Sequence, residues 1–285
     1  MHENWETPMR SMGSSITIKA NKRKSIDLKE LWLFKELLYF FAWRDIKVRY
    51  KQTALGAGWA ILQPFLATGV FTLFFNRVAG IGSGSATIPY AVFAYLGLMY
   101  WNCFSGAVTT VANSLVSSQG LLTKIYFPRL IPPIAATALS IVDFLFAGVA
   151  FIGILVVYRI VPGAAGLLLL IPTLLLIIYG ALGMGIFFAA LNVKYRDVRT
   201  ALPYIVQIML FVTPVIYPIS LIPKRFQIYS YLNPAAGAIS SVRAGFFHQP
   251  INWLGFGLSV LGATLMMIVS IWYFKRTEKD FVDII

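Results

Sequence analysis

Six apolar runs dominate this sequence, and each is near or above the length that a helix needs to cross a bilayer. About 20 residues of helix span roughly 30 Å of hydrocarbon. The runs cover residues 57–75, 88–112, 130–158, 167–191, 201–219 and 251–274. Charged residues make up only 12% of the chain, whereas a soluble domain carries about 25%. The sequence therefore predicts an all-α polytopic membrane protein with six transmembrane helices.

Positive charge is distributed unevenly about these runs, which predicts their orientation. A basic cluster directly before the first run contains Arg44, Lys47, Arg49 and Lys51. Segments rich in Lys and Arg stay on the cytoplasmic side of a membrane. With six spans, five of the 24 Lys and Arg residues fall on the opposite side, namely Arg77, Arg159, Lys224, Arg225 and Arg243. We therefore expect both termini in the cytoplasm, as a flexible tail over residues 1–27 and a shorter tail over residues 275–285.

The net charge of +13 is explained by the same distribution. Most Lys and Arg residues lie in short segments beside apolar runs, where they act as topology signals and contact lipid headgroups. Nucleic-acid binding would require a solvated basic surface, and the chain has no solvated domain to provide one. We therefore expect membrane lipids, and no nucleic acid, as partners.

Residues 28–51, before the first span, have a helical pattern of their own. On a helix, most of the charges would share one side, and Leu31, Phe34, Leu38 and Phe41 would lie broadly opposite. This arrangement predicts an amphipathic helix lying in the cytoplasmic interface. An ordinary extended start to the first span is the alternative.

The segment between the fifth and sixth runs, residues 220–250, is neither fully polar nor apolar over a spanning length. Proline and glycine residues break it into short pieces, of which residues 235–247 could form one short helix. A re-entrant element dipping into the outer leaflet fits this pattern, because broken backbone is tolerated at depth when protein or water shields it. A plain extracellular loop is equally compatible.

Catalytic and metal-binding residues are scarce. The single cysteine, Cys103, excludes an intrachain disulfide or a cysteine metal cage. The two histidines, His2 and His248, are isolated, and no phosphate-binding loop of the Gly-x-x-x-x-Gly-Lys-Ser/Thr type occurs. We expect no catalytic site, metal or cofactor on this chain, so any ATP that drives it must be bound by another chain.

Polar and aromatic residues within the runs are the candidates for a substrate path. In the second run, Tyr95, Asn102, Ser105, Thr109 and Asn113 share one side of a helix, where they could pack on a neighbouring helix or line a passage for a hydroxyl-rich substrate. The aromatic candidates lie in the first two runs and are Phe71, Phe74, Phe75, Phe93, Tyr100 and Phe104. Such rings can contact the apolar faces of sugars, but core or lipid packing explains most of them.

Asp143 is the one acidic residue well inside an apolar run. Charged residues within membrane spans are often functional, so a coupling-ion site is one interpretation. A hydrogen bond between helices, or a carboxylate that reaches a polar cavity, is the other. We favour the second interpretation because no basic residue lies within an apolar run to pair with Asp143.

Four stretches of this sequence resemble the membrane subunit of ABC-2-type exporters of bacterial surface polysaccharides, the O-antigen, capsule and teichoic-acid group. They are WRDIKVRYKQTALGAGWAILQP at 43–64, NSLVSSQGLLTKIYFPRLIPP at 113–133, LNVKYRDV at 191–198 and LNPAAGAISSVR at 232–243. The C-terminal FKRTEKDFVDII also fits, and the resemblance covers nearly everything after residue 28. It implies a transmembrane domain over residues 28–274 in the bacterial cytoplasmic (inner) membrane.

The resemblance also implies partners and a substrate. Two copies would form the pore as a homodimer, served by two separate ABC ATPase subunits that bind ATP and Mg. The substrate would be a lipid-linked polysaccharide that moves outward, and residues 220–250 would be the re-entrant element. An ion-coupled secondary transporter would need paired intramembrane charges or an inverted repeat, and a non-transporting membrane scaffold is the remaining alternative.

Specific residues receive expected roles from this resemblance. The loop 113–129, which could form a short helix over Asn113–Tyr126, would contact the ATPase, with Arg196 and Asp197 in a second contact. The residues expected at the first contact are Asn113, Leu121, Lys124, Tyr126 and Arg129. Arg44, Lys47, Arg49 and Lys51 would meet either the pyrophosphate of the lipid carrier or ordinary headgroups, since cationic side chains pair well with phosphates.

Overall fold

The computed structural model describes residues 28–51, 56, 58–85, 88–122 and 124–278. Within these ranges every regular element is a helix, which confirms the predicted all-helical class. The predicted tail 1–27 and residues 279–285 of the C-terminal tail lie outside the described residues.

Five helical segments of the described chain are long and apolar enough to cross a membrane. The first is α3 (Gly58–Phe71), which continues as the π-helix η1 (Thr72–Val78). The others are α4 (Tyr90–Ser117), α6 (Ile131–Val157), α7 (Ala164–Lys194) and α11 (Trp253–Thr277). Each overlaps a predicted run, and α4 extends five residues beyond the predicted end at 112.

The predicted fifth span, 201–219, differs most from the structure. Helix α8 (Asp197–Val212) has 16 residues, or about 24 Å at 1.5 Å per residue. The helix ends at Val212, and the C-cap residue Thr213 is extended, with ψ of 137°. The cause is Pro214, because a residue that precedes a proline disfavours the helical region. The prediction of a helix up to residue 219 is therefore wrong.

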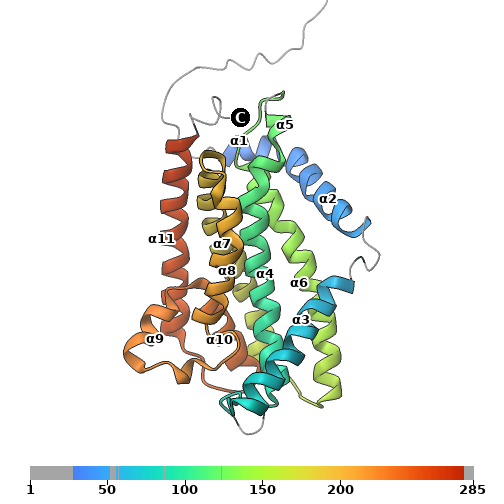
Figure 1. The fold of residues 1–285 in the computed structure, drawn as a ribbon, viewed down its shortest axis with the longest axis vertical. Coiled ribbons are helices and arrows are strands. Elements are labelled where there is room, and N and C mark those ends of the chain that lie inside the picture. The colour runs from blue at the N-terminus through green and yellow to red at the C-terminus, as the bar shows by residue number, and fades with distance from the viewer. Residues whose placement is uncertain (1–27, 52–55, 57, 86–87, 123, 279–285) are drawn as a thin grey trace, which may run out of the picture.

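Helix α4 is the centre of the bundle, with α6 and α7 packed along it and α11 on the far side of α7 (Figure 1). Most of its residues are buried. The contact with α7 is close: a Cβ atom on Gly185 would lie 2.5 Å from Val111. The small residue at this position therefore allows the two backbones to approach, as in other membrane helix pairs.

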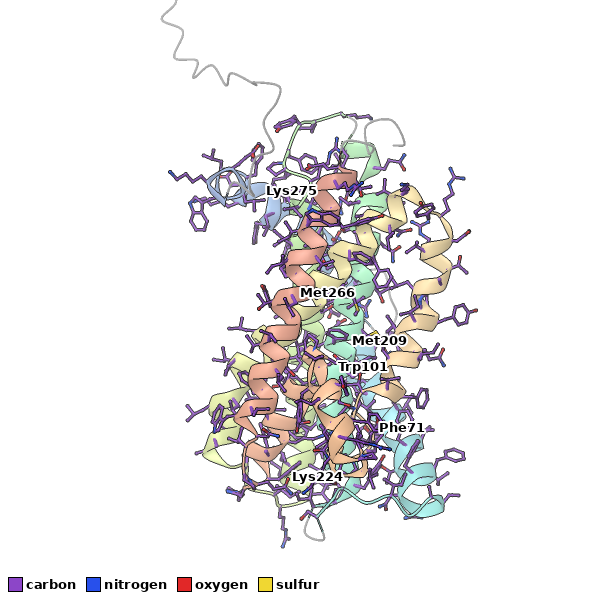
Figure 2. All side chains as sticks on the ribbon, turned by 90° about the vertical axis from the view of Figure 1, so that its left-hand side faces the viewer. Phe71, Trp101, Met209, Lys224, Met266 and Lys275 are labelled. Carbon is purple, nitrogen blue, oxygen red and sulfur yellow. The ribbon has the colours of Figure 1, made fainter. Side chains whose placement is uncertain are left out.

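The N-terminal segment forms two helices, α1 (Leu28–Leu33) and α2 (Lys35–Lys51), instead of one continuous helix over 28–51. Helix α2 lies obliquely at the same end of the bundle as α1, the short helix α5 (Gln119–Leu122) and the end of α11 (Figure 1). The two ends of the described chain therefore share one end of the bundle. Lys275 and Lys224 lie towards opposite ends (Figure 2).

Between α8 and α11 the chain forms η2 (Ile219–Leu221), α9 (Lys224–Tyr231) and α10 (Pro234–Phe246). Helix α10 confirms the predicted short helix over 235–247. It begins at an N-cap in which the Asn233 side chain accepts a hydrogen bond from the Ala235 N–H at 3.0 Å. Helix α10 is almost entirely buried against α7, α11 and α4, so the protein itself encloses this part of the segment.

Candidate functional site

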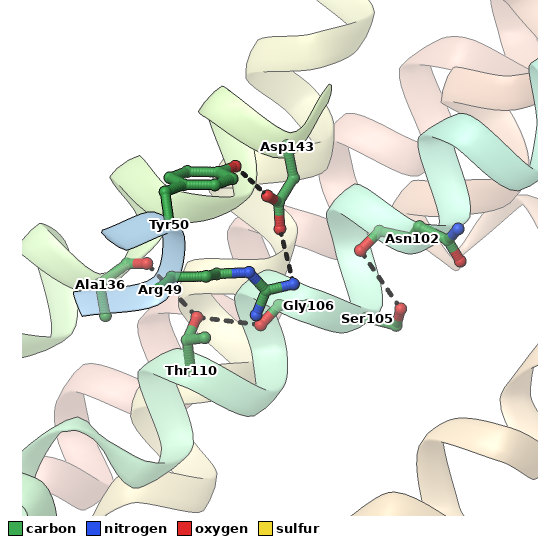
Figure 3. Close-up of polar contacts among 8 residues, drawn as sticks. All are labelled: Arg49, Tyr50, Asn102, Ser105, Gly106, Thr110, Ala136 and Asp143. Carbon is green, nitrogen blue, oxygen red and sulfur yellow. Dashed lines mark hydrogen bonds and ion pairs between the residues drawn. The ribbon is translucent and has the colours of Figure 1, made fainter. Parts of the chain in front are cut away.

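The basic end of α2 docks on α6 through the one acid that lies inside a predicted span. Asp143 forms an ion pair with Arg49, in which Nη2 of Arg49 lies 3.1 Å from Oδ2 of Asp143. The Tyr50 hydroxyl donates a hydrogen bond to the other oxygen, Oδ1 (Figure 3). Burial and the hydrogen bond to Asp143 raise the pKa of Tyr50, so the tyrosine stays protonated as the donor.

As the sequence indicates, no basic residue within an apolar run pairs with Asp143, but the structure supplies a basic partner from outside these runs. The partner comes from α2, before the first span, and is 94 positions away along the chain, since the pair joins residues 49 and 143. A carboxylate inside a membrane helix is costly unless it is paired, and here both of its oxygens have donors. Close by, the Thr110 hydroxyl of α4 lies 3.3 Å from the Ala136 carbonyl of α6 (Figure 3).

The other three cations of the basic cluster have different surroundings. Arg44 pairs with its neighbour Asp45 at 2.8 Å, and its Cζ atom lies 4.7 Å from the centre of the Phe41 ring. Lys47 and Lys51 are exposed. Within the described part of the chain, neither lysine forms an ion pair. The two lysines are therefore available to phosphate groups, whereas both arginines are already neutralised.

A cavity of about 290 Å³ lies between α2, α4 and α6 beside this cluster. It brings Arg44, a predicted phosphate contact, together with Thr109 and Asn113 of the polar stripe on α4. The Thr109 hydroxyl donates to the Ser105 carbonyl at 2.8 Å, so its oxygen remains able to accept. Hydroxyl and amide groups beside a guanidinium can bind a phosphorylated sugar. The sequence predicted each residue separately, but not the shared cavity.

Three of the predicted path residues are buried in the core. The Tyr95 hydroxyl donates to the Ala147 carbonyl at 3.1 Å. The Tyr100 hydroxyl lies 2.9 Å from the hydroxyl of Thr173, and Phe104 is fully enclosed. Tyr95, Tyr100 and Phe104 therefore hold α4 to α6 and α7 and are not part of an open surface. Asn102 and Ser105 of the same helix are partly exposed.

The aromatic residues of the first span are divided between packing and exposure. The rings of Phe71 and Phe75 lie 5.7 Å apart, edge to face. Both pack beside Tyr90 and Phe93 at the far end of α4. Phe74 is 56% exposed, whereas Phe71 and Phe75 are only partly exposed, so Phe74 is the most accessible of the three to a substrate, a lipid or another chain.

The predicted contact loop is tied to three helices at the basic end. The expected helix over Asn113–Tyr126 is wrong: α4 continues to Ser117, and a single turn, α5 (Gln119–Leu122), follows. Phe127 is buried against Phe41 of α2, with ring centres 5.7 Å apart. The Tyr126 hydroxyl donates to Glu30 of α1 at 3.4 Å.

Other predicted contact residues lie at the same end but differ in exposure. Arg129 donates to the backbone carbonyl of Glu278, at the end of α11, and Leu121 packs beside Phe127. Lys124 is exposed, as are Arg196 and Asp197, the N-cap and the first residue of α8. Asn113 instead accepts a hydrogen bond from buried Asn192 of α7 at 3.1 Å, so it joins α4 to α7.

Arg243 of α10 is a functional candidate that the sequence reasoning treated only as an outer charge. Its guanidinium is buried and donates to the carbonyls of Phe93, Pro214 and Val215. It thereby joins α4, α10 and the segment that follows α8. The sequence does contain a signal for this burial, because Arg243 is the one charged residue of a short apolar helix.

Comparison with known proteins identifies the family. The family described as "ABC-2 type transporter" matches residues 36–247. The chain belongs to this family. A relative named O-antigen export system permease protein RfbA, from Klebsiella pneumoniae, is 27% identical over 88% of this chain and 95% of its own length. A relative of the same name from Myxococcus xanthus is 28% identical over 88% of this chain and 96% of its own length. The polysialic acid transport protein KpsM of Escherichia coli is 25% identical over 73% of this chain and 82% of its own length.

The family match spans α2 to α10 and therefore includes the basic end of α2, the contact loop and Arg243. It supports the resemblance seen in the sequence.

Proposed function

We propose that this chain is the transmembrane subunit of an ATP-driven exporter that moves a lipid-linked polysaccharide outward across the bacterial cytoplasmic membrane. Two copies would form the pore, and each would bind a separate ABC ATPase. The names of the relatives support this proposal, since they refer to export of O-antigen and transport of polysialic acid. Their alignments cover most of both chains, so the likeness is not limited to one segment.

The observation that carries the mechanism is the apolar cluster between the contact loop and α2. Phe127 and Ile131 pack against Phe41, with Leu121 of α5 beside them. Movement of an ATPase against the loop would therefore displace α2 directly. Because α2 carries Arg44 and Arg49, this contact couples nucleotide-driven motion to the residues that we expect to meet the lipid pyrophosphate.

Three finer features belong to the same proposal. The basic end of the bundle would face the cytoplasm, with α1 and α2 in the interface, where Trp32 and Tyr39 are exposed and suit the headgroup level. Helix α8 would be a shorter span, the fifth of six along the chain. Helices α9 and α10 would form the re-entrant outer element, which the burial of α10 in the bundle supports.

We propose that the homodimer forms through the uncovered apolar side chains of α3 and α8. Phe65 and Leu66 on α3, and Tyr204 and Phe211 on α8, are more than half exposed. Such faces require either lipid or another protein chain. A second copy placed there would bring Phe74 and the partly exposed polar residues of α4 towards a shared passage.

Replacement of Arg44, Lys47 and Arg49 by glutamine tests the proposed contact between the basic end of α2 and the lipid pyrophosphate. We expect cells that carry the triple variant to export less surface polysaccharide, measured by immunoblot of the surface glycan. The complex with the ATPase should still co-purify, because the contact loop is unchanged. A matched control replaces exposed Lys224 and Arg225, at the other end of the bundle. Normal export by the triple variant would contradict the phosphate-contact role of these three residues and leave the exporter function standing.

The Arg49–Asp143 pair also favours testing an ion-coupled secondary transporter, because such a transporter requires paired charges near the membrane. That function predicts transport that depends on the proton gradient and is lost in Asp143→Asn. Export in proteoliposomes that requires ATP, and persists when the gradient is dissipated, excludes it. Co-purification of an ATPase whose activity requires this chain excludes a non-transporting scaffold.

A further inference from the structure

The four cations at the basic end of α2 form two classes. Both arginines already have a carboxylate: Arg49 has Asp143 and Arg44 has Asp45. Both lysines are exposed and, within the described residues, form no ion pair. A guanidinium can bind a phosphate through two parallel hydrogen bonds, which an ammonium cannot. The two guanidinium groups, which are best suited to bind a phosphate, are therefore the ones already paired with a carboxylate of the protein.

The Arg49–Asp143 pair differs from the Arg44–Asp45 pair because it joins two helices. Asp143 is the only acidic residue within the five candidate spans of the described chain. Tyr50 holds its second oxygen, which fixes the carboxylate in front of Arg49. The Arg49 side chain is 46% exposed and that of Asp143 is 24% exposed, so an outside anion can reach the guanidinium and compete with the carboxylate.

Resting on the proposed function, we propose that Asp143 is a specificity-determining residue: it reserves Arg49 for pyrophosphate-linked lipid and excludes ordinary anionic phospholipid. A phosphodiester headgroup carries one negative charge, as Asp143 does, and gains little by displacing it. A pyrophosphate carries more charge and more acceptor oxygens, so it displaces the carboxylate. Anionic lipids of the cytoplasmic leaflet are attracted to basic segments, and without an internal competitor they occupy Arg49.

The test measures competition between the two kinds of lipid at the full-length chain in nanodiscs. The dissociation constant of geranylgeranyl pyrophosphate is determined by calorimetric titration in phosphatidylcholine discs, with and without phosphatidylglycerol. For wild type we expect the same constant in both. For Asp143→Asn in phosphatidylcholine discs we expect the pyrophosphate to bind at least as tightly as it binds to wild type. When phosphatidylglycerol is present we expect the dissociation constant of Asp143→Asn to rise about fivefold, because a partly exposed ion pair contributes about that factor.

Two further variants make the outcome decisive. Glu36→Gln removes the same charge from an exposed position of α2, and we expect it to behave as wild type. Tyr50→Phe removes one hydrogen bond to Asp143 and keeps the charge, so it should show a smaller loss of discrimination. If Asp143→Asn does not fold, Tyr50→Phe carries the test alone.

The possible results separate this inference from the function on which it rests. If wild type and Asp143→Asn both bind the pyrophosphate and neither responds to phosphatidylglycerol, the role of Asp143 is refuted and the proposed function stands. The same conclusion follows if Tyr50→Phe, as the sole folded variant, discriminates as wild type does. If wild type does not bind the pyrophosphate at all, the proposed phosphate contact itself fails.

Discussion

Replacement of Arg243 by methionine should destabilise the end of the bundle that lies opposite α1 and α2 (Figure 1). The guanidinium of Arg243 donates to the Phe93 carbonyl at 2.8 Å, to the Pro214 carbonyl at 3.0 Å and to the Val215 carbonyl. Its Cζ atom also lies 3.5 Å from the centre of the Phe93 ring. One side chain therefore connects α4, α10 and the non-helical segment that follows α8. Methionine fills a similar volume but donates no hydrogen bond.

The size of the effect follows from the groups that are left without partners. The carbonyls of Pro214 and Val215 lie in buried, non-helical backbone, and an unsatisfied buried acceptor costs about 1–3 kcal/mol. Loss of the buried cation offsets part of this, because its Nε atom has no partner and charged groups are costly to bury. We expect a net loss of about 3 kcal/mol, which in a chain of this size corresponds to a fall of roughly 5–10 °C in the unfolding midpoint.

The assay is thermal unfolding of the purified protein in one detergent, followed by fluorescence-detected size exclusion. Arg225→Met is the matched control, since Arg225 is an exposed arginine of neighbouring α9. We expect its midpoint to stay close to that of wild type. Equal midpoints for Arg243→Met and Arg225→Met would refute the reasoning, because they would show that the three buried contacts contribute no stability.

Three further predictions concern packing, coupling and pH. Gly262→Ala should lower the unfolding midpoint, because the new Cβ would lie 2.0 Å from the Leu232 carbonyl, whereas Gly257→Ala meets open space and should not. Phe127→Ala should reduce ATP-dependent export while the ATPase still co-purifies, because it separates the loop from α2; full export would contradict this. Burial raises the pKa of Glu278 above its ordinary value of 4.5, so the folded state holds the proton more tightly. The stability that this provides is present below about pH 4.5 and is lost as pH rises through the higher folded pKa. Glu278→Gln should remove this loss of stability when the unfolding midpoint is measured over a series of pH values. If the midpoint of the variant depends on pH as that of wild type does, the prediction is contradicted.

The sequence predicted the helices because the membrane constrains them locally. Runs of apolar residues mark a span without reference to any distant residue, and the helices α4, α6, α7 and α11 overlap their predicted runs. The failure at α8 has a local cause that was present in the sequence, namely the Thr213–Pro214 pair. The break between α1 and α2 at Phe34 carried no such signal, since neither proline nor glycine lies there.

The candidate site depended far more on contacts between distant residues. The polytopic helical architecture, the family and the cations at the basic end of α2 all follow from the residue pattern alone. Only the tertiary structure placed Asp143 against Arg49 and Tyr50, enclosed Tyr95 and Tyr100 in the core and buried Arg243. Apolar pattern and charge are properties of neighbouring residues, and the bilayer acts on them directly. Which side chains meet depends on how whole helices pack. The sequence pattern around a polar or aromatic residue is the same whether the residue is buried in the core or lines a passage.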